Sequence, residues 1–424
     1  MLAEIVENTM LLIIAIYKCL KLLNNSKQLH YRGFVFIRQG GELWTPYCLM
    51  YTLYMNTQMP HSTWVEIELE AIKNNVRYFS DNSDANLMVI VKANAYGHGA
   101  LPVLETALRA GAGWCGVARA DEALELRRAG IQCPILVLGF TPLSVIEELI
   151  VNNISMAAWD IEHLKDVDVI AQKIDMPARI HLKVDTGMGR IGVYYRDALD
   201  VARYLNGTQS LLFEGISTHY ARAHEADIAP TMEQNNRFCN VVGLLRQAGI
   251  CPSLVHSENS AAIINRLDPK WNMIRLGIAM YGLDPSEDCQ CPDDLRPALT
   301  WKTQLSQVKH VPKGIGISYG HKYITSGPEI IGTVPTGYAD GYRPYGEKTV
   351  LVRGKRVSVV GAVCMDQFMV RLDSVPGAAV GDEVVIIGCQ GMDRISAEEV
   401  ALGWNTINYD VVSSIGSRVP RVYV

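Results

Sequence analysis

The sequence predicts an α/β protein: a (β/α)8 TIM barrel followed by a mainly β C-terminal domain. Two observations lead to this prediction. Eight short apolar, β-branched runs alternate with longer segments of helical spacing, which is typical of βα units around a parallel barrel. After about residue 300 the apolar residues recur every second position instead, which is the period of half-buried strands.

The eight runs read as strands that are buried on both faces, because their apolar residues are nearly continuous. Most are followed by helix-like stretches, several of which end in glycine after alanine or asparagine, as helix C-termini often do. This regular alternation favours a closed barrel over an open sheet. The expected strands are 87–93, 114–120, 135–140, 154–160, 178–185, 213–219, 254–260 and 273–279.

The second domain is expected to span residues 299–424, after a barrel over 63–298. One helix is predicted near its end, where Ser396 and Glu399 have the spacing of a capping box. The strand-like segment "TWVEIEL", residues 63–69, precedes the barrel. The sequence leaves open whether this segment joins the second domain's sheet.

Residues 1–58 do not fit either pattern. Their apolar stretch "MLLIIAIYKCLKLL" is shorter than the roughly 20 residues that span a bilayer. Acidic residues precede it where a secretory signal carries basic ones. We therefore expect 1–58 to be a poorly ordered N-terminal extension.

Composition narrows the class of partner. A net charge of −5 gives no electrostatic case for nucleic acid or an anionic membrane as partner. The ten cysteines are scattered without paired CxxC motifs, which favours free thiols in a reducing, cytoplasmic compartment and no metal site.

In a TIM barrel the functional side chains lie at the C-terminal ends of the strands. Lys92 stands at such an end, between the apolar run of residues 87–91 and small residues. An amine in an apolar pocket loses its proton readily, which suits a Schiff base such as the one that holds pyridoxal phosphate (PLP). The alternative reading is a surface lysine that happens to follow a strand. Ser260 and the Gly277–Ile278 backbone, after the last two strands, fit a phosphate site.

Several longer motifs carry a resemblance to a known family. From about residue 63 onward the chain resembles the alanine racemases, PLP enzymes of fold type III. The motifs that carry it are, in order, "VKANAYGHG", "KVDTGMGRIG", "HSENSAA", "RLGIAMYG", "ISYG", "PTGYADGYRP", "GAVCMDQFMV" and "NTINYDVV".

The resemblance implies roles for the residues around the cofactor. Lys92 would bind PLP covalently and act as one of two catalytic bases. Arg275 would contact the pyridine nitrogen; arginine cannot accept that nitrogen's proton, which disfavours side reactions such as transamination. The other cofactor-binding residues implied are Tyr96, His219, Ser260, Gly277, Ile278 and Tyr409.

The resemblance also implies a second base on the opposite face of the substrate. That base would be Tyr319, which in the family enters the site of the other subunit of a homodimer, together with Cys364, Met365 and Asp366. Arg190 and Met365 would bind the amino-acid substrate. Lys183 is the candidate for carbamylation that the family implies; its alternative role is pairing with Asp185 or another nearby carboxylate.

The expected function is interconversion of L- and D-alanine, supplying D-alanine for peptidoglycan. A racemase of broader specificity, for example one that accepts serine, remains open. So does a non-catalytic PLP-binding barrel, although such proteins resemble only the barrel and lack the β domain. Decarboxylases of this fold type usually place a carboxylate at the pyridine nitrogen, so Arg275 argues against that activity.

Overall fold

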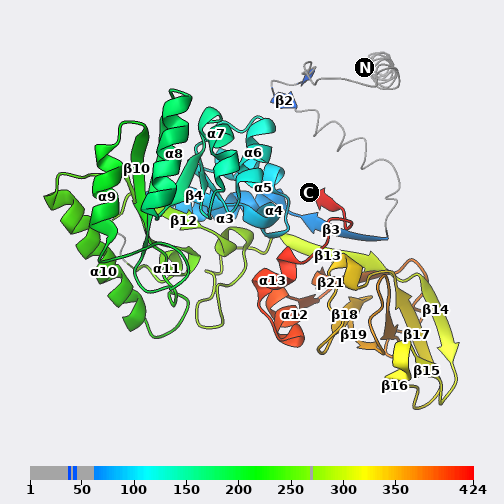
Figure 1. Cartoon of the computed structure of the whole chain (residues 1–424). Helices are drawn as coiled ribbons and strands as arrows, with labels where there is room; N and C mark the ends of the chain where they lie inside the picture. The colour runs from blue at the N-terminus through cyan, green and yellow to red at the C-terminus, as the bar shows by residue number, and fades with distance from the viewer. Residues whose placement is uncertain (1–36, 40–41, 45–61, 268–270) are drawn as a thin grey trace. The chain divides into compact units, whose positions relative to one another are not determined.

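The computed structural model describes residues 37–39, 42–44, 62–267 and 271–424 (Figure 1). Met1–Pro60 and His61–Val424 are separate compact units. In the first, β1 (Ile37–Gln39) and β2 (Glu42–Trp44) pair antiparallel, and the rest of the predicted extension lies outside the described residues. No helix among the described residues has both the length and the apolar character needed to cross a bilayer.

Eight parallel strands form the barrel of the second unit, and each overlaps one of the eight predicted runs. The fold-class prediction is thereby confirmed. The short strand β9 (Val193–Tyr194) pairs with β8 outside the main order. The barrel strands are β4 (Asn86–Ile90), β5 (Trp114–Val117), β6 (Ile135–Val137), β7 (Ser155–Ala158), β8 (Ala178–Asp185), β10 (Leu211–Ser217), β11 (Leu254–His256) and β12 (Met273–Leu276).

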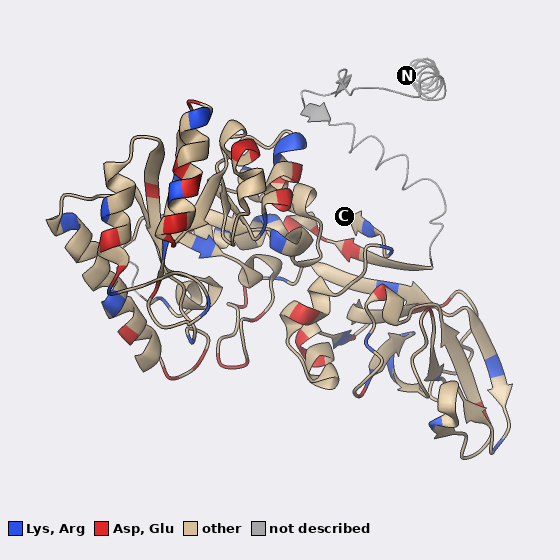
Figure 2. Ribbon diagram, viewed as in Figure 1, with Lys and Arg blue, Asp and Glu red and all other residues tan. Residues whose placement is uncertain are grey.

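Helices surround these strands (Figure 1). The helix α5, for example, is amphipathic: its apolar residues Val103 and Leu104 are buried. Basic and acidic residues are interspersed on the outer helices (Figure 2). The helices are α3 (Leu69–Asp81), α4 (Lys92–Tyr96), α5 (Ala100–Arg109), α6 (Ala120–Arg128), α7 (Leu143–Val151), α8 (Ile161–Lys173), α9 (Ala198–Gly207), α10 (Ala229–Gln247), α11 (Ser260–Ile264) and the 3₁₀ turn η1 (Ile278–Tyr281).

A side chain helps to close the barrel. β11 and β12 stand at the two ends of the hydrogen-bonded strand order. Asn272 bridges them: its Oδ1 accepts from the Val255 N–H at 2.9 Å and its Nδ2 donates to the Ser253 carbonyl at 2.7 Å. This seam lies between the strands that carry His256 and Arg275.

The second domain is built on a mixed sheet in the order β14-β17-β20-β19-β18-β21-β13-β3-β23. The segment left open by the sequence joins it: β3 (Thr63–Ile67) pairs antiparallel with β13 and parallel with β23. The remaining strands are β13 (Leu299–Gln304), β14 (Gln307–Val311), β15 (Gly316–Ile317), β16 (Tyr323–Ile324), β17 (Glu329–Val334), β18 (Thr349–Val352), β19 (Lys355–Val360), β20 (Phe368–Arg371), β21 (Glu383–Gln390), β22 (Asp393–Ile395) and β23 (Arg421–Tyr423).

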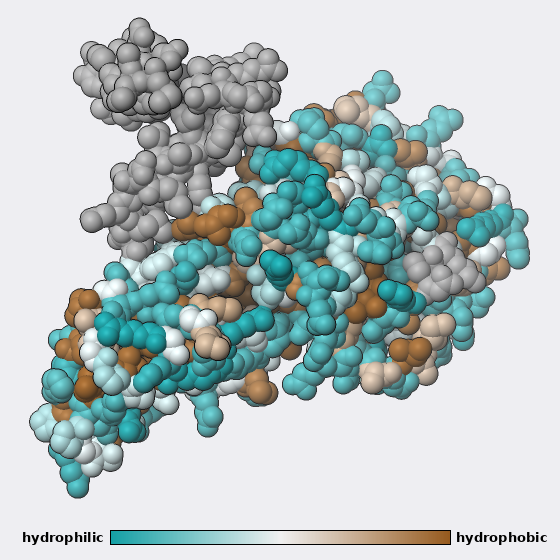
Figure 3. Space-filling model, turned by 180° about the vertical axis from the view of Figure 1, so that it is seen from behind, coloured by the Kyte–Doolittle hydropathy of each residue, from teal (hydrophilic) through white to brown (hydrophobic). Residues whose placement is uncertain are grey.

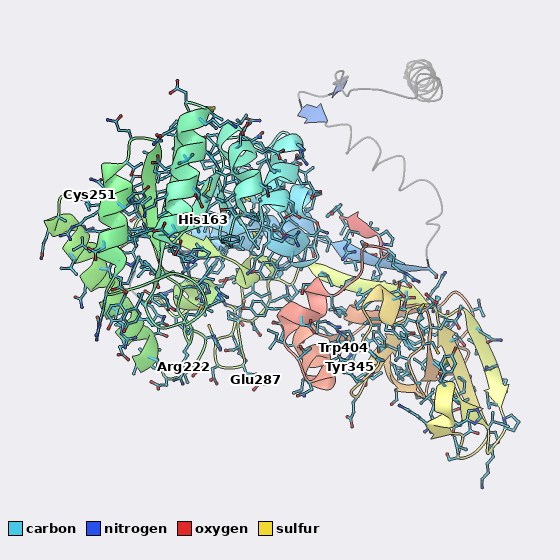
Figure 4. All side chains as sticks on the ribbon, viewed as in Figure 1. His163, Arg222, Cys251, Glu287, Tyr345 and Trp404 are labelled. Carbon is cyan, nitrogen blue, oxygen red and sulfur yellow. The ribbon has the colours of Figure 1, made fainter. Side chains whose placement is uncertain are left out.

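Aromatic side chains form the centre of this domain's core. The ring of Tyr342 stacks on Phe368 at 4.5 Å and meets Trp404 edge-on at 5.5 Å. Trp404, labelled in Figure 4, ends α12 (Ala397–Trp404), which is followed by α13 (Asn408–Ser413). One half of the predicted capping box is observed: the Ser396 Oγ accepts from the Glu399 N–H at 3.1 Å. The Glu399 carboxylate pairs with Arg356.

Candidate active site

Lys92 opens an unusual backbone turn at the C-terminal end of β4. The next four residues, Ala93–Tyr96, all have φ between 52° and 54°, so they form one left-handed turn. That conformation costs roughly 1–2 kcal/mol per L-residue, so the surroundings must hold it in place. The Glu122 carboxylate accepts from the Ala93 N–H at 2.6 Å, and the Asn94 side chain accepts from the Ala100 N–H at 2.8 Å.

The second domain packs directly onto this turn. A β-carbon on Gly97 would lie 2.2 Å from the Val412 carbonyl oxygen, so only glycine fits there. Arg421 donates from Nε to the Gly97 carbonyl at 2.9 Å. Residues from α13 and β23 therefore shape the loop that presents Lys92.

The Lys92 amine has an environment that favours its neutral form. Burial lowers its pKa, the Arg190 charge lowers it further, and Glu122 opposes the shift. The amine lies 5.8 Å from the centre of the Tyr96 ring. A neutral amine at a barrel mouth is a competent nucleophile and a competent base.

A glycine-lined space, which we call the cradle, lies beside Lys92, bordered by Tyr96, Ser260 and Gly277. The Ser260 Oγ accepts from the Gly277 N–H at 2.9 Å. A β-carbon on Gly277 would lie 3.2 Å from the Tyr96 Oη and 3.6 Å from the Ser260 Oγ, so glycine keeps this space open. The Tyr409 ring lies 6.1 Å from that of Tyr96, and burial raises the pKa of both phenols, which keeps them as neutral donors. Hydroxyl and backbone donors around a glycine-lined space fit a phosphate group.

Arg275 lies buried beside this cradle and donates to four acceptors. Its Nη1 lies 2.7 Å from the Nδ1 of His256, and its Nη2 lies 3.0 Å from the Nδ1 of His219. Nη2 also reaches the carbonyls of Thr218 and Ser257 at 3.0 and 2.9 Å. Burial lowers the pKa of Arg275 to about 10, against the opposing charge of Glu258, so the side chain stays a cation at neutral pH.

Lys183 is a second lysine whose surroundings favour the neutral amine. Burial moves its pKa well below the ordinary value, helped by the charges of Arg275 and Arg190 and opposed by Asp185. The Asp185 Oδ1 accepts from the backbone N–H groups of Gly187 and Met188, each at 2.9 Å, so this carboxylate organises its own loop. Arg190 is itself exposed at the end of that loop.

Tyr319 lies in the β domain, in the turn η2 (Tyr319–His321), and is 76% exposed. Figure 1 places the flanking strands β15 and β16 at the end of that domain away from the barrel. The preceding Ser318 has φ 64°, and its Oγ donates to the Ala362 carbonyl at 2.7 Å and contacts the Cys364 Sγ at 3.4 Å. Tyr319 thus occupies a strained turn locked to the loop of Cys364, Met365 and Asp366.

The structure therefore sorts the predicted residues into two groups. The first converges at the barrel mouth and consists of Lys92, Tyr96, Lys183, Arg190, His219, Ser260, Arg275, Gly277, Ile278 and Tyr409. The second, in adjacent loops of the β domain, consists of Tyr319, Cys364, Met365 and Asp366.

Sequence reasoning missed three residues near the barrel group: Glu122, His181 and Glu214. His181 did carry a signal, because it shares a strand face with Lys183 at two-residue spacing, between apolar residues on either side. Glu214 carried no such signal, because the direction of its side chain depends on a β-bulge between Phe213 and Gly215.

Comparison with known proteins places this arrangement in context. Sequence models of the alanine racemase N-terminal and C-terminal domains match residues 67–285 and 298–423. The alanine racemase of Desulfovibrio desulfuricans is 43% identical over 365 residues, which cover 85% of this chain and 98% of that protein.

Two solved structures are similar along most of their length. A crystal structure of alanine racemase from Bacillus anthracis with bound L-Ala-P has a TM-score of 0.82 and 40% identity, covering 87% of this chain and 96% of that one. A histidine racemase from Leuconostoc mesenteroides has a TM-score of 0.79 and 27% identity, covering 87% and 99%.

Proposed function

The chain belongs to the alanine racemase family, and from that premise we propose that Lys92 and Tyr319 are the two bases of its racemisation reaction. The enzyme is a PLP-dependent racemase that interconverts L- and D-alanine. The observation that carries the site assignment is the convergence of a largely buried lysine of lowered pKa, a glycine-lined cradle and a buried arginine at one barrel mouth.

The barrel residues suit the cofactor's three functional parts. Tyr96, Ser260, Tyr409 and the backbone of Gly277 and Ile278 would hold the phosphate, Lys92 would bind the cofactor covalently, and Arg275, with His219 beside it, would face the ring nitrogen. Bound PLP withdraws electrons and so acidifies the Cα–H of an amino acid. Because Arg275 stays a cation and can only donate a hydrogen bond, it would pair with the unprotonated ring nitrogen and would not stabilise its protonated form.

Racemisation then needs proton transfer on both faces of Cα. Lys92 Nζ would remove or return the proton on one face and Tyr319 Oη on the other, so that neither group has to reach across the substrate. Arg190, at the end of the β8 loop, would bind the substrate carboxylate, and Met365 would line the substrate site from the β domain.

We place Tyr319 in the active site of a partner subunit, as part of a homodimer with shared sites. Its exposure and its position on the β domain support this assignment. Apolar residues gather on that domain in Figure 3, and Tyr319, Ile324, Tyr338 and Met365 are each more than 40% exposed. In this arrangement residues 63–298 would bind PLP and residues 299–424 would contribute to the partner's site.

Mixed dimers test the shared site. Lys92→Ala and Tyr319→Phe homodimers should each be nearly inactive. If the sites are shared, a hybrid of the two variants regains one intact site, because the wild-type Lys92 and Tyr319 then meet across the interface. Reconstituted mixtures that stay as inactive as either parent would contradict the assignment. The matched control is the Lys92→Ala protein taken alone through the same dissociation and reassociation.

The substrate range is tested by racemisation in D2O with alanine, serine and histidine. Alanine should exchange fastest. Histidine belongs in the panel because a racemase of that amino acid shares this fold at 27% identity. Alanine turnover below that of the other two would favour the broader racemase. Binding of PLP without exchange of any amino acid would favour the non-catalytic barrel.

The biological setting follows from the same proposal. We assign the enzyme to the cytoplasm, where it would supply D-alanine for peptidoglycan. A strain in which the gene is deleted should then require D-alanine for growth, unless it carries a second racemase.

A further inference from the structure

Three buried side chains, Arg275, His256 and His181, lead from the proposed cofactor site to the partly buried carboxylate of Glu214. Arg275 Nη1 lies 2.7 Å from His256 Nδ1, and His256 Nε2 lies 3.0 Å from His181 Nδ1. His181 Nε2 lies 3.3 Å from the Oε2 of Glu214. We call this chain of Arg275, His256, His181 and Glu214 the barrel relay.

Arginine and carboxylate at the two ends fix the direction of every hydrogen bond. Arg275 can only donate, so His256 Nδ1 must be unprotonated and its proton must sit on Nε2. That Nε2–H donates to His181, so His181 Nδ1 is also unprotonated and its proton sits on Nε2. The ionised Glu214 can only accept, which matches the proton on His181 Nε2.

Glu214 is held firmly as the accepting end. It occupies the bulge of β10, and Gly215 beside it leaves room for the imidazole, since a β-carbon there would lie 2.4 Å from His181 Nδ1. Arg179 donates to its Oε1 at 2.9 Å, and Ser155 donates to its Oε2. Although burial alone would raise the pKa of Glu214, the hydrogen bonds from His181 and Ser155 hold it below the ordinary value.

Both histidines of the relay are completely buried. Burial lowers the pKa of His181, against the opposing effect of Glu214, and moves the pKa of His256 well below its ordinary value, reinforced by the Arg275 charge. Both imidazoles are therefore neutral at physiological pH, as the directional argument requires.

We propose that Glu214 is a positioning residue that acts on Arg275 through two imidazoles, by holding His181 and His256 in the Nε2–H tautomer. His256 then always presents a lone pair to Arg275. The reverse tautomers would place an N–H of His256 against an N–H of Arg275 and would break that contact. The effect on catalysis rests on the proposed role of Arg275 at the ring nitrogen. The tautomer assignment depends only on the hydrogen bonds among the four side chains of the barrel relay.

The tautomers can be measured without any activity. Histidine ring ¹⁵N spectra of the cofactor-free and cofactor-loaded protein distinguish a protonated from an unprotonated ring nitrogen. His181 and His256 are assigned by loss of their signals in His181→Gln and His256→Gln. Both should be neutral with the proton on Nε2. A proton on Nδ1 of His256 in the wild-type protein overturns the proposal.

Three variants then test the influence of Glu214. Glu214→Met leaves the His181 Nε2–H without an acceptor, so the Nε2–H tautomer now buries an unsatisfied donor and competes with the Nδ1–H tautomer, which breaks the contact with His256. His181 should then no longer show a single Nε2–H tautomer, and kcat/KM for alanine should fall about 10- to 100-fold, as expected for one unsatisfied buried donor. Glu214→Asp keeps the carboxylate and should restore the tautomer and most of the activity. Glu66→Met, which removes a half-buried ion-paired glutamate from the β domain, is the matched control.

A Glu214→Met protein with wild-type tautomers, or with altered tautomers and unchanged kcat/KM, overturns the positioning role. If the wild-type protein racemised no amino acid, the proposed function would fail, while the ¹⁵N spectra would still decide the relay.

Discussion

The carbonyl oxygen of Val412 lies 2.2 Å from the point that a β-carbon on Gly97 would occupy. Gly97 follows the left-handed turn of Lys92, and Val412 belongs to α13 of the other domain. This contact makes the conformation of the Lys92 turn depend on how the β domain packs against it. Adding one methyl group at Gly97 tests this dependence.

Gly97→Ala should lower the free energy of unfolding by about 3 kcal/mol, combining a left-handed alanine with overpacking. Chemical denaturation measures it. Gly130→Ala is the control, since Gly130 also has a positive φ, 93°, but would place its β-carbon more than 4 Å from any neighbour. That control should lose only about 1 kcal/mol. Equal losses in the two variants would show that the Val412 contact is not close.

Ser260→Ala should weaken PLP binding about 10- to 100-fold, the cost of one hydrogen bond to a charged phosphate. Titration of the cofactor-free protein with PLP, followed by absorbance, gives the dissociation constant. Ser253→Ala removes a hydroxyl that donates to the Glu214 carbonyl, away from the cradle, and should bind PLP like the wild type. Unchanged affinity in Ser260→Ala would remove this hydroxyl from the phosphate site.

His98 should make the fold sensitive to acid. Burial lowers its pKa to about 4, against hydrogen bonds that the ring donates to the backbone of Tyr96 and Ala95, which would raise it. In the unfolded chain this histidine has an ordinary pKa near 6.5. Between about pH 6.5 and about pH 4 the unfolded chain therefore binds a proton that the folded chain does not, and the free energy of unfolding decreases as the pH falls. The loss should approach about 3 kcal/mol.

Unfolding free energies at about pH 7 and about pH 4.5 measure this loss. His98→Phe should remove that share of the pH dependence, whereas His310→Gln, at an exposed histidine of β14, should keep it. A pH dependence that survives in His98→Phe would mean that other groups cause it.

Lys183 should react with CO2. Burial and the charges of Arg275 and Arg190 favour its neutral amine, which would attack the carbon; one C=O electron pair would move to oxygen and the amine would release a proton, leaving a carbamate anion that those charges would stabilise. Protein equilibrated with ¹³C-bicarbonate should show a carbamate signal by NMR that is absent from Lys183→Gln and present in Lys165→Gln, a change at an exposed lysine. A wild-type spectrum without that signal would favour a simple amine at this position.

The barrel strands could be predicted because burial on both faces leaves a visible mark, a nearly continuous apolar run. The place of Thr63–Ile67 could not, because its partner β13 lies more than 200 residues away and both candidate sheets need the same alternation. The left-handed turn was invisible too: alanine, asparagine and tyrosine do not demand positive φ, and the turn exists because Glu122 and α13 hold it.

In the site, too, some residues could be predicted from the sequence and others could not. Lys92, Ser260 and Gly277 stood out by their positions at strand ends, while the roles of Tyr319 and Arg275 came from family resemblance. The barrel relay escaped both routes. Its direction depends on which ring nitrogen meets which neighbour, a property of side-chain geometry that residue types alone do not encode.

The packing of Arg421 against Gly97 joins positions 324 residues apart, which matters for the order of events during synthesis. On the ribosome, the βα units are made long before α13 and β23. Until that later segment emerges, the turn lacks its contacts with Val412 and Arg421 and is held less firmly, by Glu122 and the Asn94 side chain. The barrel of a nascent chain should therefore not bind PLP. Binding should begin only after residue 421 has been synthesised.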